Sequence, residues 1–225
     1  MKDLLLRRES VMMAKVGHGL PLGYRELEYV KSEGNSGQYI MLDFVPDNTC
    51  GFACAVSLDQ SISDDFFGGV RTSNSSYGRF AITSTGNYLY GSLGIATPAA
   101  YRPYVSTSSR VSISVNFLNS RKIKNGLCDT YTITNNFINT GSLKMVIAGG
   151  VNKQGTVQCS AQKTYEWIIT KGSEIMYYFV PCLNASTGKA GLYDLCGNVC
   201  IKTGTPFFIP DSASLTAGPE IGVGG

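Results

Sequence analysis

The sequence predicts an all-β fold, a sandwich of two antiparallel sheets or a jelly roll, from three observations. A dozen or more short apolar segments follow one another at intervals of about 8–15 residues, with turn residues between them. The chain of 225 residues is rich in Gly (26) and Tyr (13), and only 16% of it is charged, a mixture that favours strands and tight turns. Strands do not alternate with helices, so we do not expect a parallel sheet.

The clearest strand is expected at 110–118, where Val111, Ile113 and Val115 alternate with polar residues, a pattern typical of a half-buried strand. Asn125-Gly126 is a favoured type I′ pair and predicts a hairpin between its flanking segments. We expect the strands at 27–30, 38–45, 51–58, 65–70, 79–83, 88–93, 110–118, 121–124, 127–134, 143–148, 156–159, 165–170, 175–180 and 205–209.

The segment 175–194 predicts a corner near the end of the domain. Aromatic residues precede Pro181, and because proline has no amide hydrogen, we expect the strand to end there. The chain is expected to turn back between Gly188 and Gly191. A second hairpin is expected at Gly197-Asn198, before the last strand.

Three parts of the chain differ in composition. Residues 1–19 mix charged residues with apolar ones and predict a short amphipathic helix or an extended arm that docks on a partner, the alternative being a disordered tail. Residues 20–216 form the β domain, and residues 217–225 form a Gly-rich, extended tail. The apolar residues of the arm are Leu4, Leu5, Leu6, Val11, Met12 and Met13.

Charge and cysteine content limit the partners. A net charge of +3 with no long Lys/Arg cluster does not indicate nucleic acid, and low charge suits packing in an assembly or contact with neutral sugars. We find no secretory signal and no apolar run long enough to span a membrane. The seven cysteines, an odd number, are expected to be mostly free thiols made in a reducing cytosol.

We expect no metal and no cofactor, with two alternatives. Two C-x3-C pairs, Cys50/Cys54 and Cys196/Cys200, fall within zinc-site spacing, but buried core cysteines are the favoured interpretation. Calcium is the second alternative, with candidates in the segment DFVPDN, where residues of the Asx type beside proline more often form turns. These candidates are Asp43, Asp47 and Asn48.

No catalytic group is expected. A polysaccharide hydrolase needs two carboxylates on one face, and Glu26 and Glu28 have the spacing for this. Leu27 and Tyr29 define the opposite, apolar face, so a solvated face is favoured for the two glutamates. The only histidine, His18, lies in the expected arm between two glycines and is not expected to activate a Ser or Cys nucleophile.

Sugar binding remains a hypothesis for the variable loops. Sugar sites combine aromatic platforms with amide and hydroxyl groups, and segments 73–90 and 100–104 are rich in Tyr, Asn, Ser and Arg. The alternative is tyrosine packed half-buried between strands. The candidate binding residues are Tyr77, Tyr88, Tyr90, Tyr101, Arg102 and Tyr104.

Two segments carry a family resemblance. LPLGYRELEYVKSEGNSGQYI near the start and MYYFVPCLNASTGKAGLYDLCGN near the end resemble a family common in bacteriophages and prophages of gut bacteria. Together they cover about a fifth of the chain and fit one domain. The turn Glu-Gly-Asn-Ser-Gly and the hairpin LCGNVC depart from the usual forms. The matching residues are Leu20, Pro21, Tyr24, Leu27, Glu28, Tyr29, Gly37, Gln38, Tyr39 and Ile40, then Val180, Pro181, Cys182, Asn184, Gly188, Gly191, Leu192, Tyr193 and Asp194.

The resemblance implies a concanavalin A-like (LamG-type) sandwich in which the first and last strands pair and the matched residues are structural. It implies a non-catalytic virion protein, a tail fibre, baseplate or head-fibre module that displays the domain to host surfaces or glycans. The arm is then expected to attach the chain to other virion proteins, and a homo-oligomer such as a trimer is expected from particle symmetry. The alternatives are a soluble carbohydrate-binding module and a polysaccharide hydrolase.

Overall fold

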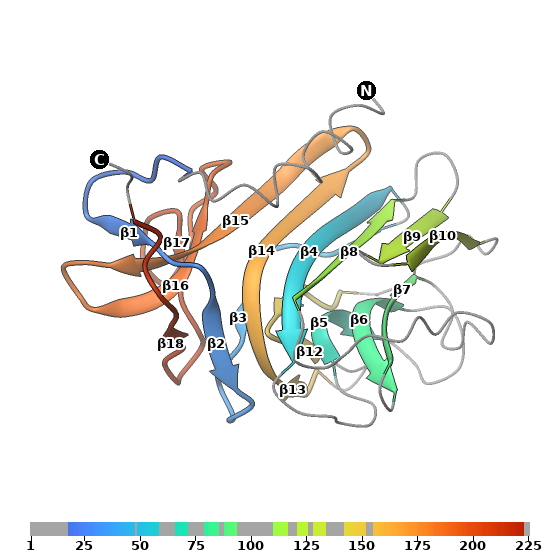
Figure 1. The fold of residues 1–225 in the computed structure, drawn as a ribbon, viewed down its shortest axis with the longest axis horizontal. Coiled ribbons are helices and arrows are strands. Elements are labelled where there is room, and N and C mark those ends of the chain that lie inside the picture. Colours follow the sequence, from blue (N-terminus) through green and yellow to red (C-terminus); the bar gives the residue numbers. More distant parts are fainter. Residues whose placement is uncertain are drawn as a thin grey trace.

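The computed structural model shows an all-β chain with no helix among the residues that it describes (Figure 1). The strands form two curled sheets, and all pairings but one are antiparallel. The all-β prediction is therefore confirmed for this part of the chain. The structure describes residues 18–47, 49–58, 66–71, 79–85, 88–93, 110–116, 121–125, 128–133, 142–151 and 155–222.

The larger sheet is built around two long strands, β14 (Ala161–Lys171) and β15 (Glu174–Asn184), which form a hairpin across the middle of the molecule (Figure 1). On the β14 side follow β4 (Cys50–Leu58), β8 (Val111–Asn116), β9 (Arg121–Asn125) and β10 (Cys128–Ile133). On the β15 side follow β16 (Lys189–Asp194) and β17 (Phe207–Phe208). The short strands β1 (Tyr24–Glu26), β2 (Val30–Glu33) and β18 (Thr216–Ala217) complete this sheet.

The smaller sheet is centred on β5 (Phe66–Arg71). It contains the one parallel pairing in the described part of the chain, between Val151 and Val70. Its other strands are β3 (Ile40–Met41), β6 (Arg79–Thr85), β7 (Tyr88–Leu93), β11 (Val146–Ile147), β12 (Gly149–Val151) and β13 (Val157–Cys159).

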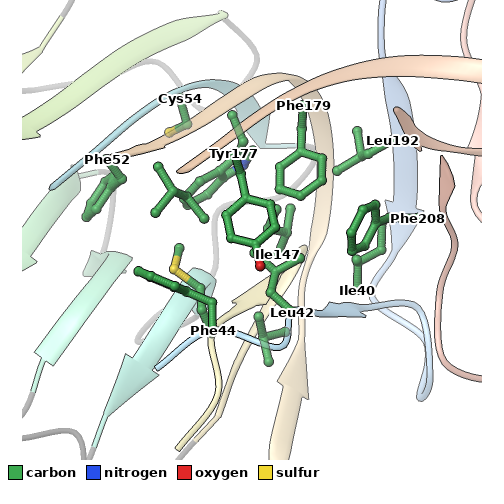
Figure 2. Close-up of a cluster of buried hydrophobic side chains, with 14 of the residues drawn as sticks. Ile40, Leu42, Phe44, Phe52, Cys54, Ile147, Tyr177, Phe179, Leu192 and Phe208 are labelled. Carbon is green, nitrogen blue, oxygen red and sulfur yellow. The ribbon is translucent and has the colours of Figure 1, made fainter. Parts of the chain in front are cut away.

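Buried side chains from both sheets belong to one hydrophobic core. Figure 2 shows Tyr177, Phe179 and Phe208 of the larger sheet beside Ile147 and Ile40 of the smaller one. The Tyr177 and Phe179 rings stack with centroids 5.3 Å apart, and Phe208 meets Phe179 edge-on at 5.0 Å. These offset and edge-on arrangements are the ones that aromatic rings prefer.

Trp167 of β14 is the largest fully buried side chain of this core, with 0% exposed. Its ring lies against the backbone of Gly68 on β5, so closely that a Cβ at residue 68 would fall well inside 3.0 Å of Cζ2 and Cη2. The strand pattern FFGGV therefore needs a residue without a side chain at this position. Among the described residues, the indole N–H of Trp167 has no hydrogen-bond acceptor.

The larger sheet curls because β14 and β15 separate beyond their shared hairpin. Trp167 to Lys171 pair with β15, whereas Ala161 to Thr164 pair with β2. β18 joins β2, and Leu215 bridges to Ala190 of β16, which returns to β15. The pairings thus form a closed circuit at this end of the sheet.

The two segments that carry the family resemblance meet in this circuit. β1 pairs with the end of β15, with Tyr24 opposite Asn184 and Glu26 opposite Cys182. The amide of Leu27 donates a 2.9 Å hydrogen bond to the carbonyl of Pro181. The two segments therefore pair, as expected, although β15 is not the last strand of the chain.

Several matched residues have structural partners, as expected. The side chain of Asp194 is completely buried, and it accepts hydrogen bonds from the amides of Tyr178 (2.8 Å), Cys196 (3.2 Å) and Asn198 (2.9 Å). A buried carboxylate requires such donors to offset its lost hydration. Asp194 therefore fixes the turn after β16 against β15.

Gln38 has a similar role at the start of the domain. Its Oε1 accepts hydrogen bonds from the amides of Glu33 (2.9 Å) and Asn35 (3.1 Å), and its Nε2 donates to the carbonyl of Ser214 (2.7 Å). The side chain thus ties the turn before β3 to the segment that leads into β18. Gly37 precedes it with φ of 84°, a conformation that glycine adopts without strain.

The expectation that β15 ends at Pro181 is wrong. β15 continues to Asn184, and Pro181 is paired with Leu192 of β16. Pro181 lies between Phe179, the last residue opposite β14, and Cys182, the first opposite β1. At Pro181 the strand β15 changes its partner from β14 to β1, so no hydrogen bond of the ladder needs an amide hydrogen there, and proline is tolerated inside the strand.

Other boundaries differ as well. The expected strand 27–30 is the break between β1 and β2, because Leu27 leaves one pairing for another. The turn expected between Gly188 and Gly191 instead lies between the end of β15 at Asn184 and the start of β16 at Lys189. Gly188, with φ of 66°, is its last residue, and Gly191 is already in β16. The strands on either side of Asn125-Gly126 pair antiparallel as expected, as β9 and β10, while Gly126 itself lies outside the described residues.

Candidate functional site

The larger sheet has a second face, directed away from the core. Trp167, Ile169, Tyr177 and Phe179 belong to the core cluster, and successive side chains of a strand point to opposite faces. The residues between them therefore point the other way. We call this surface the outer face and define it by Ala53 and Ala55 of β4, Glu166 and Ile168 of β14, Tyr178, Val180 and Cys182 of β15, and Glu26 of β1.

A β-bulge adds an aromatic residue to this face. Thr164 pairs with Val56 and Glu166 with Ala55, so Tyr165 is the extra residue of β14. Its hydroxyl lies 3.3 Å from the Ser57 hydroxyl. The bulge thus places Tyr165 and Glu166 side by side on the outer face.

His18 is anchored on the outer face by two residues. Its backbone N–H donates to Glu26 Oε2 at 2.6 Å, and its Nδ1 lies 2.5 Å from Glu26 Oε1. Its Nε2 lies 3.2 Å from the Tyr178 hydroxyl, and the two rings meet edge-on with centroids 5.8 Å apart. The Glu26 side chain is only 9% exposed, so this carboxylate and the imidazole are largely shielded from water.

The pKa of His18 is raised above its ordinary value of 6.5. The main cause is the hydrogen bond to Glu26, which favours the imidazolium; burial acts in the opposite direction, and the nearby charges of Glu26 and Glu166 add to the rise. His18, Glu26 and Tyr178 together form the His18 anchor. The sequence did not predict this anchor, because residues 18 and 178 are far apart in the chain and a solvated face was expected for Glu26, whose side chain is instead only 9% exposed.

Cys182 lies directly opposite Glu26 but is not a nucleophile in this arrangement. Its side chain is 0% exposed, and burial raises its pKa to about 12. Because the thiolate is the reactive form, this thiol is inert near neutral pH. Cys182 is thus one of the buried free thiols of the described part of the chain.

Further along the outer face, the rings of two tyrosines contact two cationic side chains. The rings of Tyr29 and Tyr165 meet edge-on with centroids 5.5 Å apart. The Arg110 guanidinium lies 4.5 Å from the centre of the Tyr165 ring, and the Lys163 ammonium 4.9 Å from that of Tyr29. Both distances are typical of cation–π contacts. Hydroxyl, aromatic and cationic groups together could hold a sugar.

The proposed metal ligands have other partners. Asp43 forms an ion pair with Lys144 at 2.8 Å, and Asp47 forms one with Lys171 at 2.8 Å. Asp47 Oδ1 also accepts hydrogen bonds from the amide (2.8 Å) and hydroxyl (2.6 Å) of Thr49, the pattern of an Asx turn. Asn48 lies outside the described residues, so calcium binding stays a hypothesis.

The cysteine pairs do not form a zinc site in the described part of the chain, which contains no group of three or more His, Cys, Asp or Glu placed to hold a metal. Cys50, Cys54 and Cys200 are buried, whereas Cys196 is exposed. Burial raises the pKa of Cys50 to about 11.

The predicted sugar-binding residues remain predictions. Tyr77, Tyr101, Arg102 and Tyr104 lie outside the described residues, as does most of the arm (residues 1–17). Tyr88 and Tyr90 lie in β7, two residues apart and so on one face of the strand, opposite Thr85 and Thr83 of β6.

In comparisons with known proteins, no family model and no curated protein matches the chain. In the described part of the chain, no helix is long and apolar enough to cross a membrane.

Proposed function

We propose that this chain is a non-catalytic bacteriophage virion protein that displays a concanavalin A-like β-sandwich for binding to host surfaces or glycans. It would be a tail-fibre, baseplate or head-fibre module, located in the virion and assembled as a homo-oligomer such as a trimer. Residues 1–19 would attach it to other virion proteins.

One observation carries this proposal. The two segments that resemble the phage family meet as β1 and β15, and their matched residues Gln38 and Asp194 fix neighbouring turns. The two motifs lie at opposite ends of the sequence but form one structural unit. Together they therefore support the resemblance better than either motif alone. The virion role follows from that resemblance.

The outer face supports the binding part of the proposal. Tyr29, Tyr165 and Ser57 supply ring faces and hydroxyl groups, and Arg110 and Lys163 supply cations. Sugars bind to such mixtures of apolar and hydrogen-bonding groups. The carboxylate of Glu26 is engaged by His18, which favours a binding role over hydrolysis at this position.

Incorporation into particles tests the virion role. The encoding phage would be propagated in cells that supply either the full chain or a chain without residues 2–17, both carrying the same C-terminal tag. We expect the full chain in density-purified particles by quantitative mass spectrometry and a large loss of the shortened one. Absence of the full chain from the particles would leave a soluble module and would refute the proposal.

Binding is tested separately on a glycan array with the purified full chain. We expect retention of at least one surface glycan, and weaker retention when Tyr165 is changed to Ala. Leu22→Ala is the matched control, because that side chain is fully exposed away from these rings. Incorporation without any glycan binding would leave plain decoration of the particle and would contradict the receptor role.

A further inference from the structure

We infer that the ligand of the outer face is an acidic sugar, one that carries a carboxylate, sulfate or phosphate group, and that three basic side chains bind this group. These side chains are Lys31, Lys163 and Arg110, which we call the basic patch. The inference rests on the proposed binding role and names the chemical class of the ligand at that same site.

The basic patch lies along one row across neighbouring strands of the larger sheet. Lys31 of β2 is directly opposite Lys163 of β14, and Lys163 is directly opposite Ser57 of β4. Thr216 of β18 is opposite Lys31 at one end of the row. Arg110 directly precedes β8, the strand next to β4, and extends the row at its other end. The row therefore presents cationic and hydroxyl groups on five adjacent strands.

Two of the positive charges are placed against each other. Directly opposite residues of antiparallel strands have Cα atoms about 4.5–5.5 Å apart, so Lys31 and Lys163 share a small region of the surface. Like charges in this position destabilise a sheet, and departures from such local rules are expected at functional sites. The Nζ of Lys31 lies 2.9 Å from the Oε1 of Glu33, which offsets one of the charges. An anionic group that bridges the two lysines would relieve their repulsion.

Aromatic rings hold two of the cations in position. The Lys163 ammonium lies 4.9 Å from the centre of the Tyr29 ring, and the Arg110 guanidinium lies 4.5 Å from that of Tyr165. The two rings contact each other edge-on. Cationic groups that are already fixed in this way lose less conformational freedom when a ligand binds. The arrangement therefore favours binding of a ligand that carries negative charge.

The chemistry of these cations favours an acidic sugar over a neutral one. The guanidinium of Arg110 can donate two parallel hydrogen bonds to a carboxylate or a phosphate, and an ammonium acts on the same groups as a point charge. Strands β14 and β8 are separated by β4, so Lys163 and Arg110 are two strand spacings apart, about 9–10 Å. A glycan with acidic groups on more than one sugar would contact both ends of the basic patch.

The basic patch is also accessible. The side chain of Lys31 is 26% exposed, Arg110 is exposed and Lys163 is half-buried. Elsewhere on the outer face, Ile168 and Val180 are only 2% and 0% exposed. A sugar therefore reaches the row of the basic patch directly, whereas the apolar part of the outer face is closed to it.

A glycan array of matched pairs tests the requirement for charge. Each pair presents one oligosaccharide with its acidic group and in an uncharged form, for example an oligogalacturonate and its methyl ester, or a sulfated chain and its unsulfated parent. We expect the full chain to retain only the acidic members and to release them as the salt concentration rises. Comparison of carboxylated, sulfated and phosphorylated members identifies the group that binds. Polyglutamate, which has carboxylates but no sugar, reports nonspecific attraction.

Charge variants locate the site, with affinity for a retained glycan measured by titration calorimetry. Lys163→Gln and Arg110→Gln should each weaken binding about tenfold or more, whereas Lys163→Arg, which keeps the charge, should restore most of the affinity. Lys144→Gln is the matched control. It removes the same charge from an exposed side chain beside the smaller sheet, where Lys144 pairs with Asp43, and it should leave binding unchanged. Circular dichroism verifies that each variant is folded.

The outcomes separate this inference from the proposed function. Neutral and acidic members retained equally well would overturn the acidic-sugar inference and leave the receptor role in place. Retention of no glycan would contradict both, and incorporation into particles would still decide the virion role. Polyglutamate bound as tightly as the glycans, or acidic glycans bound equally well by the parent, Lys163→Gln and Arg110→Gln, would also overturn the inference.

Discussion

The contact between Trp167 and Gly68 predicts a large and specific effect of a single methyl group. In Gly68→Ala, the new Cβ would lie well inside 3.0 Å of the indole carbons Cζ2 and Cη2. The ring cannot move toward solvent, because it is 0% exposed and lies beside Phe52, with ring centroids 5.6 Å apart. Overpacking of this kind typically costs about 1–3 kcal/mol, and the closed surroundings place this case near 2–3 kcal/mol.

For a chain of this length, 1 kcal/mol shifts the melting temperature by about 2–4 °C, so we expect a fall of about 4–12 °C. The assay is urea unfolding followed by far-ultraviolet circular dichroism. Emission of the single Trp reports on the same site in parallel. Gly222→Ala is the matched control, because no atom lies within 4 Å of its new Cβ, and its effect should stay within about 0.5 kcal/mol.

A double-mutant cycle makes the test specific. Trp167→Phe alone leaves a cavity and should cost about 1–3 kcal/mol, lessened because the unpaired indole N–H is removed with the ring. When Trp167→Phe is combined with Gly68→Ala, the added methyl group occupies part of that space. The double variant should therefore lose less stability than the sum of the two single losses, by at least about 1 kcal/mol. Additive costs, or a Gly68→Ala variant as stable as the parent, would refute the packing of the two sheets through Trp167.

Three further predictions concern the His18 anchor and the β15–β16 corner. Because the pKa of His18 is raised in the folded chain, its ion pair with Glu26 stabilises the fold below about pH 6.5, and this stabilisation is lost as the pH rises through the raised pKa. The difference in unfolding free energy between the parent and His18→Ala should therefore narrow from pH 6 to pH 9, by about 0.5–1 kcal/mol for a partly exposed pair. A difference that stays constant with pH would contradict this. At pH 8, a thiol reagent should modify exposed Cys196 much faster than Cys182, whose pKa is about 12, and equal rates measured by peptide mass spectrometry would contradict the burial of Cys182. Gly191→Ala would place a Cβ against the carbonyl oxygen of Phe208, and we expect at least about 2 kcal/mol of destabilisation in urea unfolding; an effect below about 0.5 kcal/mol would show that β17 is not held there.

The strands that sequence patterns predicted well are those with local signals. Tyr88 to Leu93 and the hairpin at Asn125-Gly126 show alternation and turn chemistry within a few residues, and the structure has them at the expected positions. The end of β15 was predicted wrongly at Pro181, because proline is tolerated there only where β15 changes its partner from β14 to β1, and no local pattern shows that change. Local sequence patterns indicate the chemistry of each residue, but they do not indicate which edge of a strand is left unpaired.

The candidate site was harder to predict for the same reason. His18 and Glu26 are eight residues apart, but Tyr178 comes from a distant segment, and the pairing of β1 with β15 brings the three together. The outer face was also hidden, because the bulge at Tyr165 shifts which residues of β14 point outward.

The most direct test of the virion role is electron cryomicroscopy of intact particles of the encoding phage. We expect density for this β domain at symmetry-related positions on the particle, with its N-terminal end directed toward the particle body. Particles without such density, while the chain remains soluble in the lysate, would contradict the central claim.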